Sequence, residues 1–193
     1  MEEVATRRRT SRRPVLGRRP FLAPIWLTAL LVAVVVAVAV LLYQSDATTM
    51  IVVVRPGENA PGAAQDSPLA SAGVRRAAQL ARLFSGTGAP GRIAAIYVTA
   101  ARRVQQTAAP LAARLGIRPV VVSGEDADEL AARALNEHRG AAVMVVTTAA
   151  MAPRLVEALS GIKLAPRAAD QYDEIDIVSV PALGSAALVR LHY

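Results

Sequence analysis

The chain has 193 residues, of which 53% are hydrophobic and 4% are aromatic, and it contains no cysteine. This length suits one ordinary domain with an additional segment. The absence of cysteine excludes a disulfide scaffold, a thiolate nucleophile and a metal site built on sulfur ligands. Only two histidines occur, His138 and His192, so a site that needs several imidazoles has little material.

The positive charge is concentrated at the N-terminus. The chain has 22 Lys and Arg against 15 Asp and Glu, a formal net charge of +7. Seven arginines and two glutamates fall in residues 1–20, whereas residues 46–193 carry 15 basic and 13 acidic side chains. A nearly neutral domain without a basic, aromatic-rich stripe is a poor candidate for nucleic-acid binding. We therefore expect no nucleic-acid partner.

An apolar segment, residues 21–45, follows this basic cytoplasmic tail (residues 1–20) and contains no charged residue. A helix over Ile25–Tyr43 would be about 28 Å long, close to the thickness of the hydrocarbon core of a bilayer. We predict one N-terminal transmembrane helix in this segment, acting as a signal anchor. The arginines should keep the N-terminus in the cytoplasm, which leaves the domain on the outer face of the membrane.

A cleaved signal peptide is the alternative to this anchor. Ala37-Val38-Ala39 has the small-x-small form of a cleavage site. However, the triplet lies inside the apolar run, and the run is longer than the apolar region of a typical cleaved signal. We therefore favour the uncleaved anchor.

Residues 46–193 alternate between strand-like and helical patterns. Continuous apolar strands alternating with amphipathic helices are typical of a mostly parallel sheet covered on both faces. We therefore predict a three-layer α/β/α domain. The predicted strands are Met50–Val54, Ile93–Val98, Pro119–Val122, Ala142–Val146, Ile175–Val180 and Ala186–Leu191, and the predicted helices are Leu69–Phe84, Val104–Leu115, Ala127–Glu137 and Pro153–Leu159.

Four sequence motifs in this order resemble the histidine phosphatase superfamily, which has the phosphoglycerate-mutase-like fold. In that family the first strand ends in Arg-His-Gly-Glu, and a later helix begins with Arg-Ala-x-Gln-Thr-Ala. The corresponding motifs here are VVVRPGE, DSPLASAG at residues 66–73, TAARRVQQTA at residues 99–108 and VMVVTTAAMAP at residues 143–153. The resemblance implies that the domain in residues 46–193 has this fold.

The chain departs from the family pattern at both catalytic histidines. The family nucleophile is a histidine that accepts the phosphoryl group, and here its position is taken by Pro56. The second family histidine corresponds to Thr148, or to Thr147 as the alternative. No arginine occurs between Arg55 and Arg75, so of the family's charged pocket we expect only Arg55 and Arg103 to remain.

The resemblance and its departures together predict a pseudoenzyme. We expect a membrane-anchored binding or scaffolding module with no catalytic residue and no cofactor. Its ligand would be phosphorylated or otherwise anionic, held in a vestigial phosphate pocket by Arg55, Arg103 and Thr148, or its partner would be a protein of the cell envelope. The alternatives are a phosphatase that acts on phosphomonoesters with an unconventional nucleophile and a structural domain with a vestigial pocket.

The remaining polar residues have simpler interpretations. Arg55 and Arg103 could share an anion at the ends of two neighbouring strands, or each could pair with a carboxylate such as Glu58. The acidic residues Glu125, Asp126, Asp128 and Glu129 suit the first turn of a helix better than a metal site, because carboxylates interact favourably with the helix dipole there. We expect His138 at a helix C-terminus and His192 at a strand edge. Neither should replace the family's histidines.

Overall fold

The computed structural model describes residues 25–45, 48–60, 66–86, 91–123, 126–165 and 171–193. The chain divides into two units, Met1–Ala39 and Val40–Tyr193, which are described separately. The described helices are α1 (Ile25–Ser45), α2 (Ser71–Phe84), α3 (Arg102–Leu115), α4 (Ala127–Glu137) and α5 (Met151–Ser160). The strands are β1 (Thr48–Val54), β2 (Ile93–Thr99), β3 (Val120–Val122), β4 (Ala142–Val146), β5 (Glu174–Pro181) and β6 (Ala187–His192).

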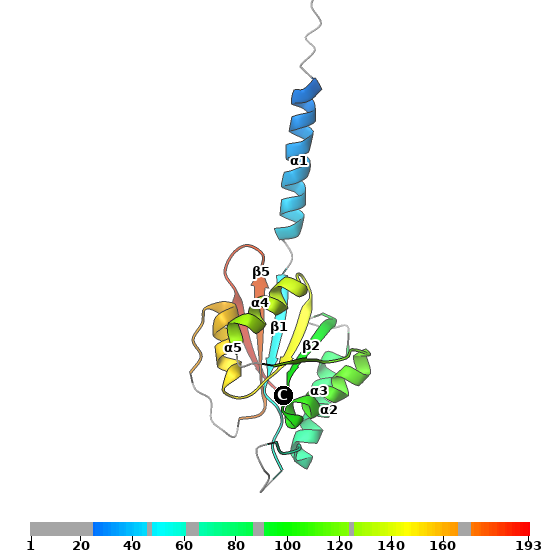
Figure 1. Ribbon diagram of the computed structural model, residues 1–193, viewed down its shortest axis with the longest axis vertical. Helices are drawn as coiled ribbons and strands as arrows, with labels where there is room; N and C mark the ends of the chain where they lie inside the picture. Colours follow the sequence, from blue (N-terminus) through cyan, green and yellow to red (C-terminus); the bar gives the residue numbers. More distant parts are fainter. Residues whose placement is uncertain (1–24, 46–47, 61–65, 87–90, 124–125, 166–170) are drawn as a thin grey trace, which may run out of the picture. The chain divides into compact units, whose positions relative to one another are not determined.

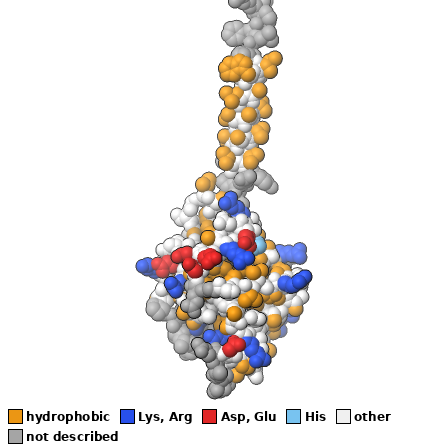
Figure 2. All heavy atoms as spheres, in the orientation of Figure 1, with side chains coloured by type: hydrophobic (Ala, Val, Ile, Leu, Met, Phe, Trp, Pro, Cys, Tyr) orange, Lys and Arg blue, Asp and Glu red, His pale blue; other side chains and the backbone are white. Residues whose placement is uncertain are grey.

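Helix α1 is built almost entirely from Leu, Val, Ala and Ile, and the face seen in Figure 2 carries apolar side chains. Its side chains are described from Ile25 to Leu41, and they are exposed. Within the residues that the structure describes, no helix is both long enough and apolar enough to cross a membrane. The transmembrane helix predicted for residues 21–45 therefore stays a prediction.

The domain contains one six-stranded mixed sheet in the order β3-β2-β4-β1-β5-β6. Strands β3, β2, β4 and β1 run parallel, whereas β5 and β6 form antiparallel pairs at one side. Helices α2 and α3 cover one face, and α4 and α5 cover the other (Figure 1). The three layers confirm the predicted α/β architecture, and the sheet is mixed because the last two strands return antiparallel.

The strand order corrects one expectation. Arg55 and Arg103 were expected at the ends of neighbouring strands, but β4 lies between β1 and β2. Strand β4 has five fully buried residues and pairs on both sides, which makes it the most enclosed strand. The loop after β4 therefore lies between the loops that carry the two arginines.

Two apolar clusters form the core, one on each face of the sheet. Alternate residues of each strand contribute to opposite clusters, as the two-residue period of a strand requires. Val53, Val145 and Tyr97 pack with α4 and α5, while Val54 and Val146 pack with α2 and α3. The same alternation determines toward which face of the sheet each polar side chain at a strand end points.

Candidate anion-binding site

The topology brings five segments to one edge of the sheet. The parallel strands β1, β2 and β4 end at this edge, the antiparallel strand β5 begins there, and β6 ends there. Ligands in open α/β sheets bind beyond the carboxyl ends of the parallel strands. The edge segments are residues 55–59, 99–103, 147–150, 171–173 and 192–193.

The loop after β1 is held tightly by α2 and α3. The backbone N–H of Gly57 donates to Oγ1 of Thr107 at 3.1 Å, and that hydroxyl donates to the carbonyl of Arg103 at 2.8 Å. A Cβ on Gly57 would lie 2.8 Å from Cα of Gly73. Only glycine fits this close backbone approach. Pro56 is buried in the same loop, and its side chain has no polar atom.

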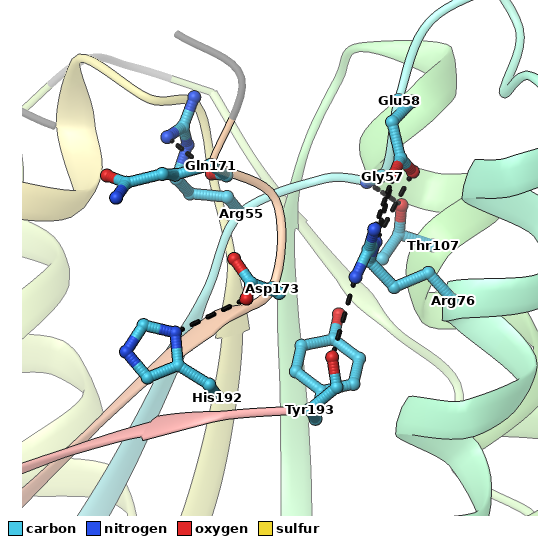
Figure 3. Close-up of polar contacts among 9 residues, drawn as sticks. All are labelled: Arg55, Gly57, Glu58, Arg76, Thr107, Gln171, Asp173, His192 and Tyr193. Atoms are coloured by element: carbon cyan, nitrogen blue, oxygen red, sulfur yellow. Dashed lines mark hydrogen bonds and ion pairs between the residues drawn. The ribbon is translucent and has the colours of Figure 1, made fainter. Parts of the chain in front are cut away.

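Arg55 extends from this loop toward the α5 side of the sheet (Figure 3). Its side chain is largely buried, with a residue exposure of 6%. Nη1 donates to the carbonyl oxygen of Gln171 at 2.8 Å, and the guanidinium carbon lies 5.6 Å from the centre of the Tyr172 ring. The segment before β5 thus supplies both a hydrogen-bond acceptor and an aromatic face to Arg55.

Arg103 lies in the first turn of α3 and is partly buried. Its Nη1 donates to Oδ1 of Asn59 at 3.3 Å, a neutral acceptor in the loop after β1. Within the described residues, Arg55 and Arg103 share no common partner. The structure therefore positions both arginines at the predicted edge, but with separate contacts.

Glu58 pairs with Arg76 of α2, so the alternative in which Glu58 pairs with Arg55 or Arg103 is not seen among the described contacts. The Glu58 Oε1 atom accepts hydrogen bonds from Nη2 and Nε of Arg76 at 2.6 and 3.1 Å. These hydrogen bonds lower the pKa of Glu58 and raise the pKa of Arg76. The guanidinium also lies 5.8 Å from the centre of the Tyr193 ring (Figure 3).

Arg76 is thus a cation that was not anticipated at this site, where only Arg55 and Arg103 were expected. It is separated from Glu58 by 18 residues, and the contact depends on how α2 packs on the loop. One signal in the sequence could have identified it. Arg76 is three residues after Gly73 and four before Leu80, both buried, so it lies on the inward stripe of the helix.

Thr148 is partly buried and lies three residues before α5. Its carbonyl accepts hydrogen bonds from the backbone N–H groups of Met151 and Ala152, and its Oγ1 lies 3.4 Å from the N atom of Met151. Thr147 is fully buried, and its backbone N–H donates to the carbonyl of Val54 at 3.0 Å. Thr147 and Thr148, the two alternative candidates from the sequence, therefore have different surroundings.

The two histidines occupy the expected kinds of position. His138 is the C-cap residue of α4, and its Nε2 lies 3.0 Å from the buried hydroxyl of Tyr97, a contact that the sequence did not reveal. His192 lies on the edge strand β6, and its Nδ1 is 3.3 Å from Oδ2 of Asp173. Both His192 and Asp173 reach the candidate edge, but the His192 side chain is 59% exposed.

The acidic segment before α4 has a structural role where it is described. Asp126 is the N-cap of α4, and its Oδ1 accepts from the backbone N–H groups of Asp128 and Glu129 at 2.9 and 3.2 Å. Glu125 lies outside the described residues. Among the residues that the structure describes, no three His, Asp or Glu side chains are grouped to hold a metal ion. On the visible face, acidic and basic side chains are mixed over α4 and α5 (Figure 2).

Comparisons with known proteins agree with this architecture. Residues 51–125 match the model of the histidine phosphatase superfamily (branch 1). A comparison with curated proteins found no match. Among solved structures, the protein histidine phosphatase SixA complexed with tungstate is similar, with 21% identity and a TM-score of 0.60 over 74% of this chain and 96% of that chain.

Two further solved structures have the same fold. The mycobacterial glucosyl-3-phosphoglycerate phosphatase has 15% identity and a TM-score of 0.57, over 76% of this chain and 98% of its own. YhfR from Bacillus stearothermophilus has 19% identity and a TM-score of 0.57, over 73% of this chain and 95% of its own. The family match over residues 51–125 and the shared fold support the resemblance of this chain to the histidine phosphatase superfamily.

Proposed function

We propose that this chain is a membrane-anchored, non-catalytic member of the superfamily that binds a phosphorylated or otherwise anionic ligand. The proposal rests on Pro56. This residue is buried in the loop after β1, and the neighbouring Gly57 is fixed by a hydrogen bond to Thr107. Family catalysis requires an imidazole to accept the phosphoryl group. Proline has no side-chain heteroatom, so no phosphoenzyme can form at this position.

The surroundings of Thr148 support the same proposal. An unactivated hydroxyl is a weak nucleophile, and it needs an adjacent base. The Thr148 side chain lies instead against the backbone N–H of Met151 at the start of α5. No described contact joins it to a histidine or lysine.

The arginines support the binding part of the proposal. Guanidinium groups bind phosphate and carboxylate oxygens with paired hydrogen bonds. The described partner of Arg103 is a neutral amide oxygen, which an anionic oxygen would outcompete. The related SixA structure holds tungstate, a tetrahedral oxyanion, which is consistent with an oxyanion pocket in this fold.

The anchor rests on the sequence. The uncharged run of residues 21–45 follows a segment with seven arginines, and positively charged flanks remain on the cytoplasmic side. In this arrangement the domain lies on the outer face of the membrane, where its ligand or a protein partner of the cell envelope would meet it.

The test combines catalysis and binding on the full chain in detergent. We expect hydrolysis of a generic phosphomonoester to equal the buffer blank, and we expect inorganic phosphate to raise the melting temperature by mass action. Arg103→Ala should abolish that increment, whereas Arg102→Ala, the same charge change at the exposed neighbouring residue, should preserve it.

Two results would contradict the proposal. Turnover that disappears in Thr148→Ala would favour the alternative, a phosphatase with an unconventional nucleophile. A melting temperature that phosphate does not change would remove the anion-binding role and favour a scaffold for a protein partner.

A further inference from the structure

A row of polar residues follows the last positions at which the adjacent strands β2, β4 and β1 pair with one another. Val98 of β2 pairs with Val146 of β4, and Val146 pairs with Val54 of β1. The next residues along the three chains are Thr99, Thr147 and Arg55. Adjacent strands lie about 4.8 Å apart, so this polar row spans about 10 Å across the edge.

The polar row faces α4 and α5. The residues two positions earlier, Tyr97, Val145 and Val53, all pack in the cluster formed with these helices. Since side chains alternate between faces, the polar row points to the same side. Arg55 is seen on that side in Figure 3, toward α5. Arg76 and Glu58 lie on the opposite side, against α2.

The two hydroxyl groups of the row are buried and make no hydrogen bond within the described part of the chain. Thr147 has 0% exposure, and Oγ1 of both Thr147 and Thr99 lacks a partner. Other buried threonines differ. Oγ1 of Thr49 accepts from the Gly140 N–H at 3.0 Å, and Oγ1 of Thr107 bonds to two groups. Buried hydroxyls are normally satisfied, so two unsatisfied ones side by side indicate a missing partner.

We propose that Thr99 and Thr147 donate their hydroxyl hydrogens to one tetrahedral oxyanion, the phosphate group of the ligand, beside the Arg55 guanidinium. This inference rests on the proposed anion-binding function and identifies further residues of that site. Thr147, rather than Thr148, supplies the hydroxyl after β4. Two hydroxyl groups and a guanidinium can donate hydrogen bonds to three oxygen atoms from different directions. This arrangement suits a tetrahedral oxyanion better than a planar carboxylate.

Two neighbouring features fit this assignment. Helix α5 begins four residues after Thr147, and the positive end of its dipole favours an anion nearby. Val122, the register partner of Thr99, lines a cavity of about 240 Å³ together with Leu130, Met151 and the charged residues Asp126, Glu129 and Arg133. The three residues of the polar row do not line it. The cavity provides space on the same face of the sheet for the organic part of a phosphorylated ligand.

The test uses Thr147→Val, which keeps the shape of the side chain and removes the hydroxyl. In buffer without phosphate, this variant should melt at a higher temperature than the unmodified chain, because it removes a buried unsatisfied hydroxyl. Its affinity for inorganic phosphate, measured by titration calorimetry on the full chain, should fall at least about tenfold, since a hydrogen bond to a charged group is lost. Thr147→Ser should retain the affinity.

Thr49→Val is the matched control at the other end of the sheet. It removes a satisfied hydroxyl, so it should lower the melting temperature while leaving phosphate affinity unchanged within about twofold. The comparison separates the loss of a ligand contact from the general effect on stability of replacing a buried threonine by valine.

Several outcomes would overturn the inference. A lower melting temperature of Thr147→Val without phosphate would show that the hydroxyl is already satisfied, for example by a buried water. Phosphate affinity in Thr147→Val equal to that of the unmodified chain would exclude the hydroxyl contact and leave the proposed function intact. Failure of the unmodified chain to bind phosphate would refute the proposed anion binding itself.

Discussion

Arg76 of α2 and Glu58 of the loop after β1 form a side-on ion pair, in which Oε1 of Glu58 accepts two hydrogen bonds from the guanidinium at 2.6 and 3.1 Å. The Arg76 and Glu58 side chains are 24% and 21% exposed. It connects the site loop to the helix that covers it. Removal of either partner should therefore loosen the loop.

Arg76→Met should lower the free energy of unfolding by about 1–3 kcal/mol at neutral pH, because it leaves Glu58 partly buried without its partner. The pKa of Glu58 is lowered in the folded state, so the stabilisation is present above the ordinary value of 4.5 and is lost as the pH falls through the folded value. Urea unfolding at several pH values measures the free energy of unfolding and its dependence on pH. The difference between Arg76→Met and the unmodified chain should shrink as the pH falls below the ordinary value of 4.5.

Arg75→Met is the control for this experiment, because Arg75 is exposed on the same helix and should change stability by less than about 0.5 kcal/mol. An equal loss in both variants, or a loss in Arg76→Met that is constant down to pH 2, would contradict the role of the pair.

Tyr193 should produce an alkaline decline in stability. Burial raises its pKa to about 12, against an ordinary value of 10.0. The folded state then holds a proton that the unfolded state releases, so stability should fall as the pH rises from about 10 toward 12. Tyr193→Phe should reduce this decline. A decline of the same size in this variant would assign it to other groups.

Gly73→Ala should destabilise the domain although alanine favours helices more than glycine does. A Cβ at this position would lie 2.8 Å from the carbonyl oxygen of Glu58 and 3.0 Å from its nitrogen, and backbone atoms cannot rotate away. We expect a loss of about 1–3 kcal/mol, measured by denaturant unfolding. Gln79→Ala, on the exposed side of α2, should be neutral or slightly stabilising. A stabilised Gly73→Ala would show that the loop shifts freely.

The anchor predicts the side of the membrane on which the domain lies. Protease added to intact cells or spheroplasts should digest residues 46–193, because positively charged flanks remain in the cytoplasm. A protein fused to the N-terminus should stay protected and serves as the control. Protection of the domain, or a mature chain that begins beyond residue 39, would refute the uncleaved anchor.

Local patterns in the sequence predict most of the elements, and long-range packing decides the rest. The bounds of α4 and β4 are as predicted, since Asp126 caps the helix and β4 is continuously apolar. Helix α5 begins two residues earlier than predicted, at Met151, because Thr148 accepts hydrogen bonds from its first turn. The resemblance placed Arg55 and Arg103 at the correct edge.

The contacts within the site could not be predicted in the same way. Arg76 meets Glu58 because a glycine lets α2 approach the loop closely. Gln171 meets Arg55 across 116 residues because β5 returns antiparallel beside β1. The unsatisfied hydroxyl of Thr147 depends on the register of β4 between β1 and β2. Each of these relations arises only once distant segments are packed together.

The central place of β4 also determines when the domain can fold during synthesis. Val54 pairs with Val146 and with Ile175, so both neighbours of β1 come from the second half of the domain. Contacts of such large sequence separation form slowly. A chain released before β4 would hold β1 and β2 with open, apolar edges and nothing to join them, a state prone to aggregation. Both pairing partners of β1 exist only after β5, Glu174–Pro181, has been made, so the apolar edges of β1 stay open in a nascent chain until then.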